Sequence, residues 1–194
     1  MKICVYGATS DEIDASFIKA TEELGALMAK RGHTLVYGGG ASGLMGAAAR
    51  GAKSQNGEII GIAPSFFEVD GVLFDGCTEF IYTETMRERK ALMEEKSDAF
   101  IMTPGGVGTF DEFFEILSLR QVARHDKPIA VFNVNGYYDA LRNLMQNALD
   151  KKFMTEATFR LAKFYTTPEE IIEYFENYTP SEYDFEVLKK VKKD

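Results

Sequence analysis

The sequence predicts a single α/β domain with a doubly wound, mainly parallel sheet. Short, continuous apolar runs alternate with segments whose apolar residues fall at helical spacing, an order that implies parallel strands joined by right-handed crossovers. The runs show no polar alternation, as expected of strands that are covered on both faces. With 194 residues, 45% of them hydrophobic and 27% charged, the chain matches one globular domain. We expect residues 1–180 to form this Rossmann-like domain and residues 181–194 a charged helix or tail.

Four strands and three helices are predicted in the first half of the chain. Lys2–Tyr6 is a short apolar run with β-branched residues, which is typical of a strand. Gly32 ends a preceding helix and Pro64 closes a strand. The predicted strands are residues 2–6, 34–37, 58–62 and a short one at 79–82, and the helices lie at 13–31, 44–53 and 86–96. Residues 64–78 are irregular.

The second half continues the alternation. Strands are predicted at residues 99–102 and 129–133, and helices at residues 110–122 and 137–149. A further helix starts at Thr167-Pro168-Glu169-Glu170, where threonine is the cap, proline takes the first helical position and acidic residues occupy the first turn.

Charge and composition exclude several functions. The chain has 22 basic and 30 acidic residues, a net charge of −8, which repels phosphate backbones and argues against nucleic-acid binding. A single nucleotide in a locally positive pocket is compatible with it. The cysteines Cys4 and Cys77 and the two histidines have no zinc-ligand spacing, so no metal site and no disulfide scaffold are expected.

No targeting or membrane segment is predicted. The first apolar run is too short for a signal sequence, and the uncharged stretch 32–49 is rich in glycine and includes polar Thr34 and Ser42. We therefore expect a cytoplasmic protein without a membrane partner.

The first glycine-rich turn, residues 37–46, leaves several interpretations open. Gly38-x-Gly40-x-x-Gly43 matches the dinucleotide fingerprint and joins a strand to a helix. It follows the second strand rather than the first, and no acidic residue ends the third strand, which argues against an NAD-dependent oxidoreductase. The alternatives are a backbone that approaches phosphate or ribose and a tight turn that packs its helix closely through Gly43 and Gly46.

The second glycine-rich turn, residues 103–112, predicts an anion site. It closes one strand and opens one helix, so convergent backbone N–H groups and the positive end of the helix face the same point. No Gly-Lys-Ser/Thr follows, so it is not a Walker loop, and its size suits a monophosphate. The candidate phosphate-binding residues are Gly105, Gly106, Val107, Gly108 and Thr109.

Glu112 has two interpretations. Thr109-x-x-Glu112 fits a capping box in which Thr109 caps the helix and Glu112 bonds back. Alternatively, Glu112 lies one turn past a phosphate site, with Glu115 one turn further on the same face. A carboxylate beside a bound sugar phosphate is what glycosidic cleavage needs, because it stabilises an oxocarbenium ion and orients or deprotonates water.

The preceding helix carries a mixed stripe. Met86, Arg89, Lys90 and Met93 share one face at helical spacing. A guanidinium beside methionines either extends along apolar surface to reach solvent or is directed at an anion.

Taken together, these segments resemble the Lonely Guy (LOG) family of phosphoribohydrolases over about residues 2–178. The motifs that carry the resemblance are Gly38-Gly39-Gly40-x-x-Gly43-Leu44-Met45-Gly46, Met86-x-x-Arg89-Lys90 and Pro104-Gly105-Gly106-x-Gly108-Thr109-x-x-Glu112, with flanking matches at Ser97–Phe100, Asp126–Pro128 and Asn133–Tyr138. Their combination is specific, whereas either glycine turn alone is weak.

The resemblance implies a Rossmann-like fold, usually a homodimer, and hydrolysis of the N-glycosidic bond of nucleoside 5′-monophosphates, especially cytokinin ribotides and AMP. The products are the free base and ribose 5-phosphate, and no cofactor is implied. The family's catalytic pair falls on Arg89 and Glu112, and its phosphate loop on residues 105–109. Further candidate substrate-binding residues are Gly39, Gly40, Gly43, Met86, Lys90 and Glu115.

In the expected mechanism, Glu112 activates water, Arg89 orients the ribose or phosphate, and Glu115 or bound water helps to protonate the leaving base. Residues 64–78 are expected to shape the base pocket, with Phe66, Phe67 and Leu73 available for an apolar recess, the core or a dimer contact.

Departures and rival functions are also apparent. The family's first strand commonly ends in Cys-Gly-Ser-Ser, whereas this chain has Tyr6-Gly7-Ala8-Thr9-Ser10, so Thr9 or Ser10 supplies the expected hydroxyl. Relatives are often labelled lysine decarboxylases, but no lysine here is marked as a pyridoxal-phosphate Schiff base. The rivals are a non-catalytic nucleotide or cofactor carrier and a structural dimer with relic pockets. The pairing of Arg89 with Glu112 favours the enzyme.

Overall fold

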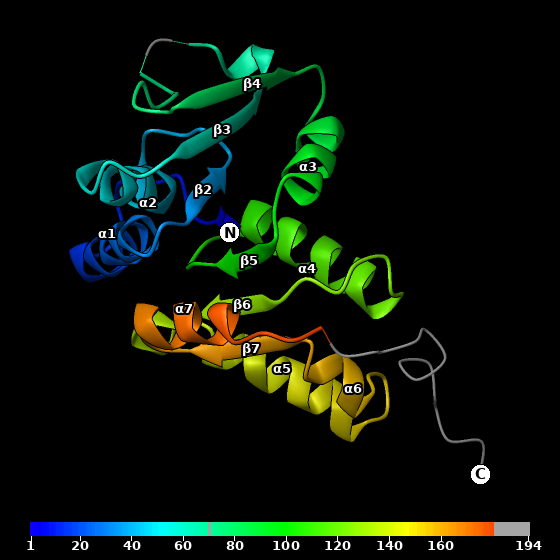
Figure 1. Ribbon diagram of the computed structural model, residues 1–194. Coiled ribbons are helices and arrows are strands. Elements are labelled where there is room, and N and C mark those ends of the chain that lie inside the picture. The colour runs from blue at the N-terminus through cyan, green and yellow to red at the C-terminus, as the bar shows by residue number, and fades with distance from the viewer. Residues whose placement is uncertain (70, 181–194) are drawn as a thin grey trace.

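Seven parallel strands form one sheet in the computed structural model, which describes residues 1–69 and 71–180 (Figure 1). The strands are β1 (Lys2–Tyr6), β2 (Thr34–Tyr37), β3 (Ile59–Pro64), β4 (Glu79–Thr83), β5 (Ala99–Met102), β6 (Ile129–Phe132) and β7 (Ala162–Tyr165). Their order is β4-β3-β2-β1-β5-β6-β7, and every pairing between them is parallel. The predicted doubly wound sheet is therefore confirmed. The predicted C-terminal helix or tail at 181–194 lies outside the described residues.

The strand order reverses between β1 and β5. The chain winds from β1 through β2 and β3 to β4 on one side, and then crosses back to β5 on the other side of β1. Such a switch point leaves a crevice beyond the carboxyl ends of the two central strands, because their connections leave in opposite directions.

Helices cover both faces of the sheet (Figure 1). They are α1 (Ala15–Lys30), α2 (Gly43–Ser54), α3 (Met86–Glu95), α4 (Val107–Gln121), α5 (Asp139–Asp150), α6 (Glu156–Phe159) and α7 (Pro168–Glu176), with 3₁₀ turns η1 (Ser65–Phe67) and η2 (Val134–Gly136). No helix of the described part is both long and apolar enough to cross a membrane.

Two hydrophobic cores result, one on each face. The first joins the sheet to α1, α2 and α7, and the second joins it to α3, α4, α5 and α6. In β1, Ile3 and Val5 belong to the first core. Cys4 and Tyr6 belong to the second. Because successive strand residues point to opposite faces and both faces are covered, the strands read as continuous apolar runs.

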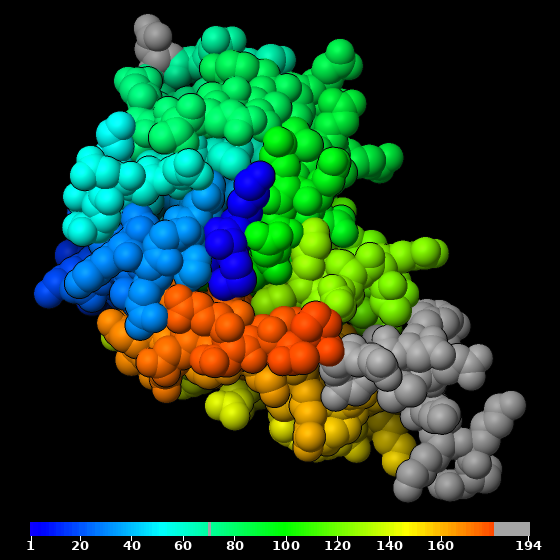
Figure 2. Space-filling view, in the orientation of Figure 1, coloured from blue at the N-terminus to red at the C-terminus, as the bar shows by residue number. Residues whose placement is uncertain are grey.

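Polar contacts link α7 to the loop before β2, at the amino ends of the strands. Glu176, at the end of α7, accepts from Arg31 Nη1 at 3.0 Å and lies 3.2 Å from His33 Nε2. In the space-filling view, α7 forms part of the surface beside the dark-blue N-terminal residues (Figure 2). Both cysteines are free thiols, and Cys4 is buried as expected.

Two local predictions have opposite outcomes. Thr167 caps α7, as the sequence predicts, and it also forms a capping box with Glu170. Of the two interpretations of Glu112, the capping box with Thr109 is excluded, because α4 begins at Val107 with Gly106 at its N-cap. A glycine cap has no side-chain signal, so the sequence places the helix start three residues too late. The strand β7 and the short helix α6 have no counterpart in the sequence predictions.

Candidate active site

A cleft of about 690 Å³ opens beyond the carboxyl ends of the strands, next to the switch between β1 and β5. Its walls come from the loop after β1, the two glycine turns, the loop before β4 and the first turns of α3 and α4. The predicted site residues that line it are Gly40, Met86, Arg89, Gly106, Val107, Gly108, Thr109 and Glu112. The fold thus brings together three segments that are far apart in the sequence.

The cleft also receives residues from the irregular segment and from the loop after β1. Phe67, Val72 and Leu73 line it, which gives the cleft an apolar wall. Phe66 does not line it and is 57% exposed. Thr9 and Ser10, the two candidates for the expected hydroxyl, both line the cleft.

The remaining predicted residues lie behind or outside this surface. Gly39 and Gly43 are not among the lining residues, and both have a positive φ, 78° and 59°, that favours glycine. Gly105 packs against Thr109 rather than facing the cleft. Lys90 and Glu115 line a separate hollow of about 520 Å³ along α4. Their predicted contact with substrate stays a prediction.

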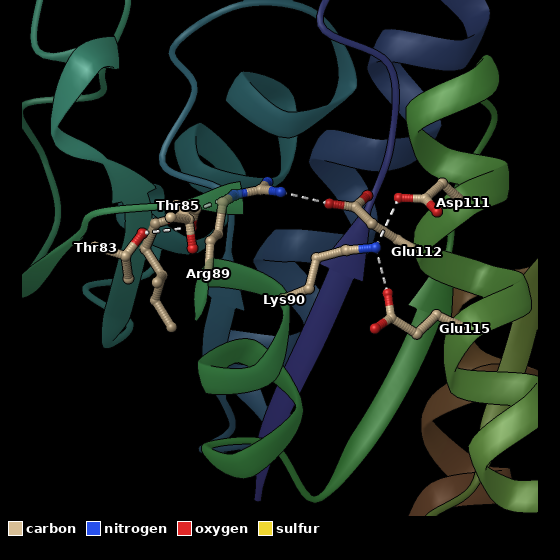
Figure 3. A network of polar contacts seen from close by, with 8 residues as sticks. Thr83, Thr85, Arg89, Lys90, Asp111, Glu112 and Glu115 are labelled. Carbon is tan, nitrogen blue, oxygen red and sulfur yellow. Dashed lines mark hydrogen bonds and ion pairs between the residues drawn. The ribbon is translucent and has the colours of Figure 1, made fainter. Parts of the chain in front are cut away.

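Arg89 and Glu112 form a buried ion pair across the cleft floor. Arg89 Nη1 donates to Glu112 Oε1 at 2.7 Å, and Arg89 Nε donates to the Ile62 carbonyl at the end of β3 at 3.2 Å. The two side chains are 5% and 8% exposed. Figure 3 shows Arg89 reaching from α3 toward Glu112 on α4. The ion pair therefore links the N-terminal halves of α3 and α4.

The start of α3 is fixed by its own caps. Thr85 accepts from the Glu88 backbone N–H at 3.1 Å, and Glu88 in turn accepts from the Glu84 backbone N–H at 3.0 Å. These two bonds set the first turn of α3, from which the Arg89 side chain extends to the Ile62 carbonyl of β3. Arg89 is therefore placed by a local signal that lies just before it in the sequence.

Gly38 makes room for the guanidinium. A Cβ at this position would collide with Arg89 Nη2 and would lie 2.7 Å from the Met45 terminal methyl. The close approach requires glycine, so the first glycine turn contributes to the site through an absent side chain. Local sequence pattern does not indicate this role of Gly38, because the contact joins residues that are far apart in the chain.

Burial dominates the electrostatics of Glu112. Removal from water raises the pKa of this carboxyl above its ordinary value, and the Arg89 guanidinium opposes the shift without cancelling it. A carboxyl with a raised pKa is a stronger base when ionised, and holds a proton better, than one in water. Glu112 is therefore a candidate acid–base group on the wall of the cleft.

Lys90 has a different environment from its neighbour Arg89. Its Nζ lies 2.9 Å from Asp111 Oδ2 and also pairs with Glu115, as Figure 3 shows. Hydrogen bonding to Glu115 raises the pKa of Lys90, which keeps the amine protonated. A Schiff-base lysine must react as a neutral amine, and no lysine of residues 1–69 and 71–180 lines the cleft. These residues do not fit a pyridoxal-phosphate site.

The first glycine turn has its helix N-terminus occupied. Gly43 N donates to Asp11 Oδ1 at 2.7 Å, and Leu44 N donates to the Ala8 carbonyl at 2.8 Å. The bond from Gly43 is the main cause that lowers the pKa of Asp11 below its ordinary value. The carboxylate of Asp11 thus takes the place that an anion would take at α2. Sequence reasoning missed it, because Asp11 is remote from the turn.

The second glycine turn leaves its helix N-terminus open. The N-cap Gly106 makes no side-chain capping bond, and the first helical bond runs from Phe110 N to the Gly106 carbonyl at 3.0 Å. In the described part of the chain, the backbone N–H groups of 107–109 have no acceptor. Because these groups border the cleft, they form a ready site for a small anion.

No three histidine, cysteine, aspartate or glutamate side chains come together as a possible metal site within residues 1–69 and 71–180.

The amino-acid sequence matches a known protein family. A family model described as possible lysine decarboxylase matches residues 45–175. A cytokinin riboside 5′-monophosphate phosphoribohydrolase of Mycobacterium tuberculosis is 39% identical over 79% of this chain and 81% of its own length. One from Arabidopsis thaliana is 32% identical over 95% of this chain and 86% of its own length.

A solved structure shares the fold at lower identity. The molybdenum cofactor binding protein of Rippkaea orientalis aligns with a TM-score of 0.66 at 24% identity, over 90% of this chain and 93% of its own. This likeness concerns the fold alone. The identities to the two phosphoribohydrolases extend over most of both chains, and the present chain belongs to the Lonely Guy family.

Proposed function

We propose that this protein hydrolyses the N-glycosidic bond of a nucleoside 5′-monophosphate and releases the free base and ribose 5-phosphate. The observation that carries the proposal is the buried Arg89–Glu112 pair one helical turn from an open helix N-terminus, in one cleft. An anion site next to a poised carboxylate matches a substrate whose phosphate and glycosidic bond lie a ribose apart. The names of the relatives support the same reaction.

In the proposed complex, the phosphate binds the backbone N–H groups at the start of α4. These donors and the positive end of the helix stabilise the anion without a metal ion. The ribose then extends along α4 toward Glu112. Arg89, held by Glu112 and by the Ile62 carbonyl, is fixed in position to orient the sugar and to balance the negative charges around it.

Glu112 then acts on water at the anomeric carbon. The C1′–N bond breaks with its electron pair leaving on the base, and the carboxylate stabilises the oxocarbenium-like transition state. The water oxygen bonds to C1′ while Glu112 accepts a proton, which its raised pKa favours. A proton then returns to the base, so that the net reaction adds water across the bond. Arg89 stays protonated, which suits it to an electrostatic role.

The base is proposed to lie against the apolar wall. Phe67, Val72, Leu73 and Met86 line the cleft together with the α4 turn. Such a wall suits a purine, and the names of the relatives favour a cytokinin ribotide, with AMP as the simpler substrate. Glu115, expected to help in protonating the base, lines the separate hollow instead.

The family resemblance also supports a homodimer. On α4, Val107 is 83% exposed and Phe114 is 39% exposed, so this helix offers apolar surface to a second copy. Light scattering after size-exclusion chromatography tests the dimer, and a mass of 21.7 kDa, that of one chain, would exclude it under those conditions.

We also propose that the protein is cytoplasmic, since its two free thiols fit the reducing conditions of that compartment.

The proposal is tested by incubating the purified protein with AMP, an isopentenyladenine ribotide, the other common nucleoside monophosphates and the matching nucleosides. Free base and ribose 5-phosphate are assayed. Release from a monophosphate but not from its nucleoside is expected, because the α4 turn needs the phosphate. Tight binding without release from any of them would favour the carrier function, which has no use for the Arg89–Glu112 pair.

A further inference from the structure

The backbone carbonyl groups of the second glycine turn are held by hydrogen bonds from other parts of the chain. Three successive carbonyl oxygens each accept a hydrogen bond from outside the turn. The donors are Tyr138 Oη to the Thr103 carbonyl at 2.7 Å, Ala8 N to the Pro104 carbonyl at 3.0 Å and Tyr137 Oη to the Gly105 carbonyl at 2.9 Å. A run of carbonyls fixed in this way determines the direction of the peptide planes that follow.

The peptide between Gly105 and Gly106 is the one that matters for an anion. In a trans peptide, the N–H points opposite to the carbonyl of the preceding residue. With the Gly105 carbonyl directed to Tyr137, the Gly106 N–H is directed away from Tyr137. Gly106 lines the cleft and Gly105 does not. The tyrosine bond therefore keeps a donor, rather than a carbonyl oxygen, on the side of the phosphate site.

This peptide also needs an external constraint more than its neighbours do. It joins two glycines, and glycine adopts positive and negative φ values about equally readily. A flip of this peptide plane therefore costs little conformational energy by itself. At Gly106 a Cβ would meet nothing within 4 Å, so packing does not restrict this residue. A flip would present the Gly105 carbonyl to a phosphate, and two negative oxygens would face each other. The orientation depends on the bond from Tyr137.

Tyr137 is itself well held. Its ring meets Phe17 of α1 edge-on with centroids 5.9 Å apart, and Tyr138 with centroids 4.9 Å apart. The two residues before it, Asn135 and Gly136, have φ values of 52° and 72°, which turn the chain so that the tyrosine points back to the α4 turn. Tyr137 is 45% exposed, whereas Tyr138 is buried in the second core. The Tyr137 hydroxyl is thus removable without opening the core.

We propose that Tyr137 is a positioning residue of the anion-binding turn, which acts by holding the Gly105 carbonyl away from the cleft. It touches neither the reacting atoms nor the base, and its effect is confined to ligands that carry a phosphate. The proposal rests on the proposed function for the identity of the anion, and its binding test does not require turnover.

The test compares wild type with Tyr137→Phe, which keeps the ring and removes the hydroxyl. Calorimetry with ribose 5-phosphate is expected to give an affinity about five- to tenfold weaker, the usual effect of one lost hydrogen bond. KM for the monophosphate rises by the same factor, kcat stays within about twofold and the pH profile does not move. Inhibition by the matching nucleoside, which lacks the phosphate, is unchanged.

Tyr178→Phe is the matched control. Its hydroxyl accepts from Arg120 Nη2 at 2.6 Å and donates to the Asp126 carbonyl at 2.8 Å, and neither partner lines the cleft. Loss of this hydroxyl is therefore expected to leave phosphate binding unaltered. Unchanged affinity for ribose 5-phosphate in Tyr137→Phe would overturn the proposal. Equal weakening of nucleoside and phosphate ligands would overturn it too, because it would indicate general loss of structure. If the wild type binds ribose 5-phosphate but hydrolyses nothing, the proposed function fails while the calorimetry still decides the role of Tyr137.

Discussion

The two glycine turns follow β2 and β5, the strands on either side of β1, and each leads into a helix. Their backbone N–H and carbonyl groups are nevertheless paired in opposite ways. In the first turn, the N–H groups at the start of α2 are taken by Asp11 and by the Ala8 carbonyl. In the second turn, the carbonyls are taken by Tyr137, Tyr138 and Ala8 N, while the N–H groups at the start of α4 have no acceptor among the described residues.

The difference teaches that a glycine motif does not by itself identify an anion site. In both turns the glycines allow another group to come close to the backbone. An anion site, however, requires backbone N–H groups that have no acceptor within the protein. At the first turn, the Arg89 guanidinium occupies the space beside Gly38. At the second turn, the space beside the glycines is left for a ligand. The first turn makes room for Arg89, the proposed catalytic partner of Glu112, and the second is proposed to bind the substrate.

The largest expected effect comes from Glu112→Gln. If α4 carries both the anion site and the base, loss of the carboxylate lowers kcat by about 10³-fold, since general-base catalysis contributes roughly 10²- to 10⁴-fold. Ribose 5-phosphate binding is expected to persist, because the turn is unchanged. Steady-state kinetics, with circular dichroism to verify folding, measures both.

The control for this change is Glu176→Gln, which removes a carboxylate that pairs with Arg31 and His33 at the opposite end of the sheet. It is expected to retain turnover. Near-normal turnover in Glu112→Gln would make the Arg89–Glu112 pair a structural link between α3 and α4.

Gly38→Ala tests the role assigned to the first turn. A methyl group there meets the Arg89 guanidinium, so Arg89 must shift from its bond to Glu112. We expect kcat to fall roughly 10- to 100-fold, the size of effect that a displacement of about 1 Å produces, with binding of ribose 5-phosphate little changed. If ribose 5-phosphate binding is lost and kcat is retained, the first turn contacts the phosphate and the contrast between the turns is wrong.

The pH dependence of the reaction sharpens the contrast further. Burial raises the pKa of Glu112 above 4.5, and the base is active only when ionised. The rate is therefore expected to be full above that raised pKa and to fall about tenfold for each pH unit below it. A profile of kcat/KM against pH should show this acid limb above pH 4.5. A flat profile down to pH 4.5 would mean that Glu112 is not the essential base.

Much of the fold was predictable because its signals are local. The strands at 2–6, 34–37 and 99–102 agree with their predicted bounds, since each is buried on both faces beyond its first residue and is apolar there. The strand β7 has no sequence prediction because three of its four residues are partly exposed and the charged Lys163 interrupts the apolar run.

The site was less accessible to sequence reasoning. The residue spacing placed Arg89 and Glu112 on helices, but only the family resemblance paired them. The contacts that separate the two turns join Asp11 to Gly43 and Gly38 to Arg89, pairs with no fixed spacing. Whether an N–H is free depends on what the rest of the chain brings to it, and local pattern does not contain that information.

The smallest expected effect is that of Asp11→Ala, which empties the N-terminus of α2. Its bond to Gly43 N lowers the pKa of Asp11 below 3.8, so the carboxylate stabilises the fold above that pH and the contribution is lost as the pH falls through the lowered pKa. Thermal unfolding at pH 7 should therefore give a Tm lower by a few degrees in the variant, and the difference should vanish in acid.

The same variant frees the Gly43 N–H, which makes the first turn resemble the second. If capping alone distinguishes the turns, inorganic phosphate should now raise the Tm of Asp11→Ala slightly more than that of the wild type. Equal Tm values for the two proteins at pH 7 would show that Asp11 does not cap α2 in solution, and the difference between the turns would then rest on the carbonyl side alone.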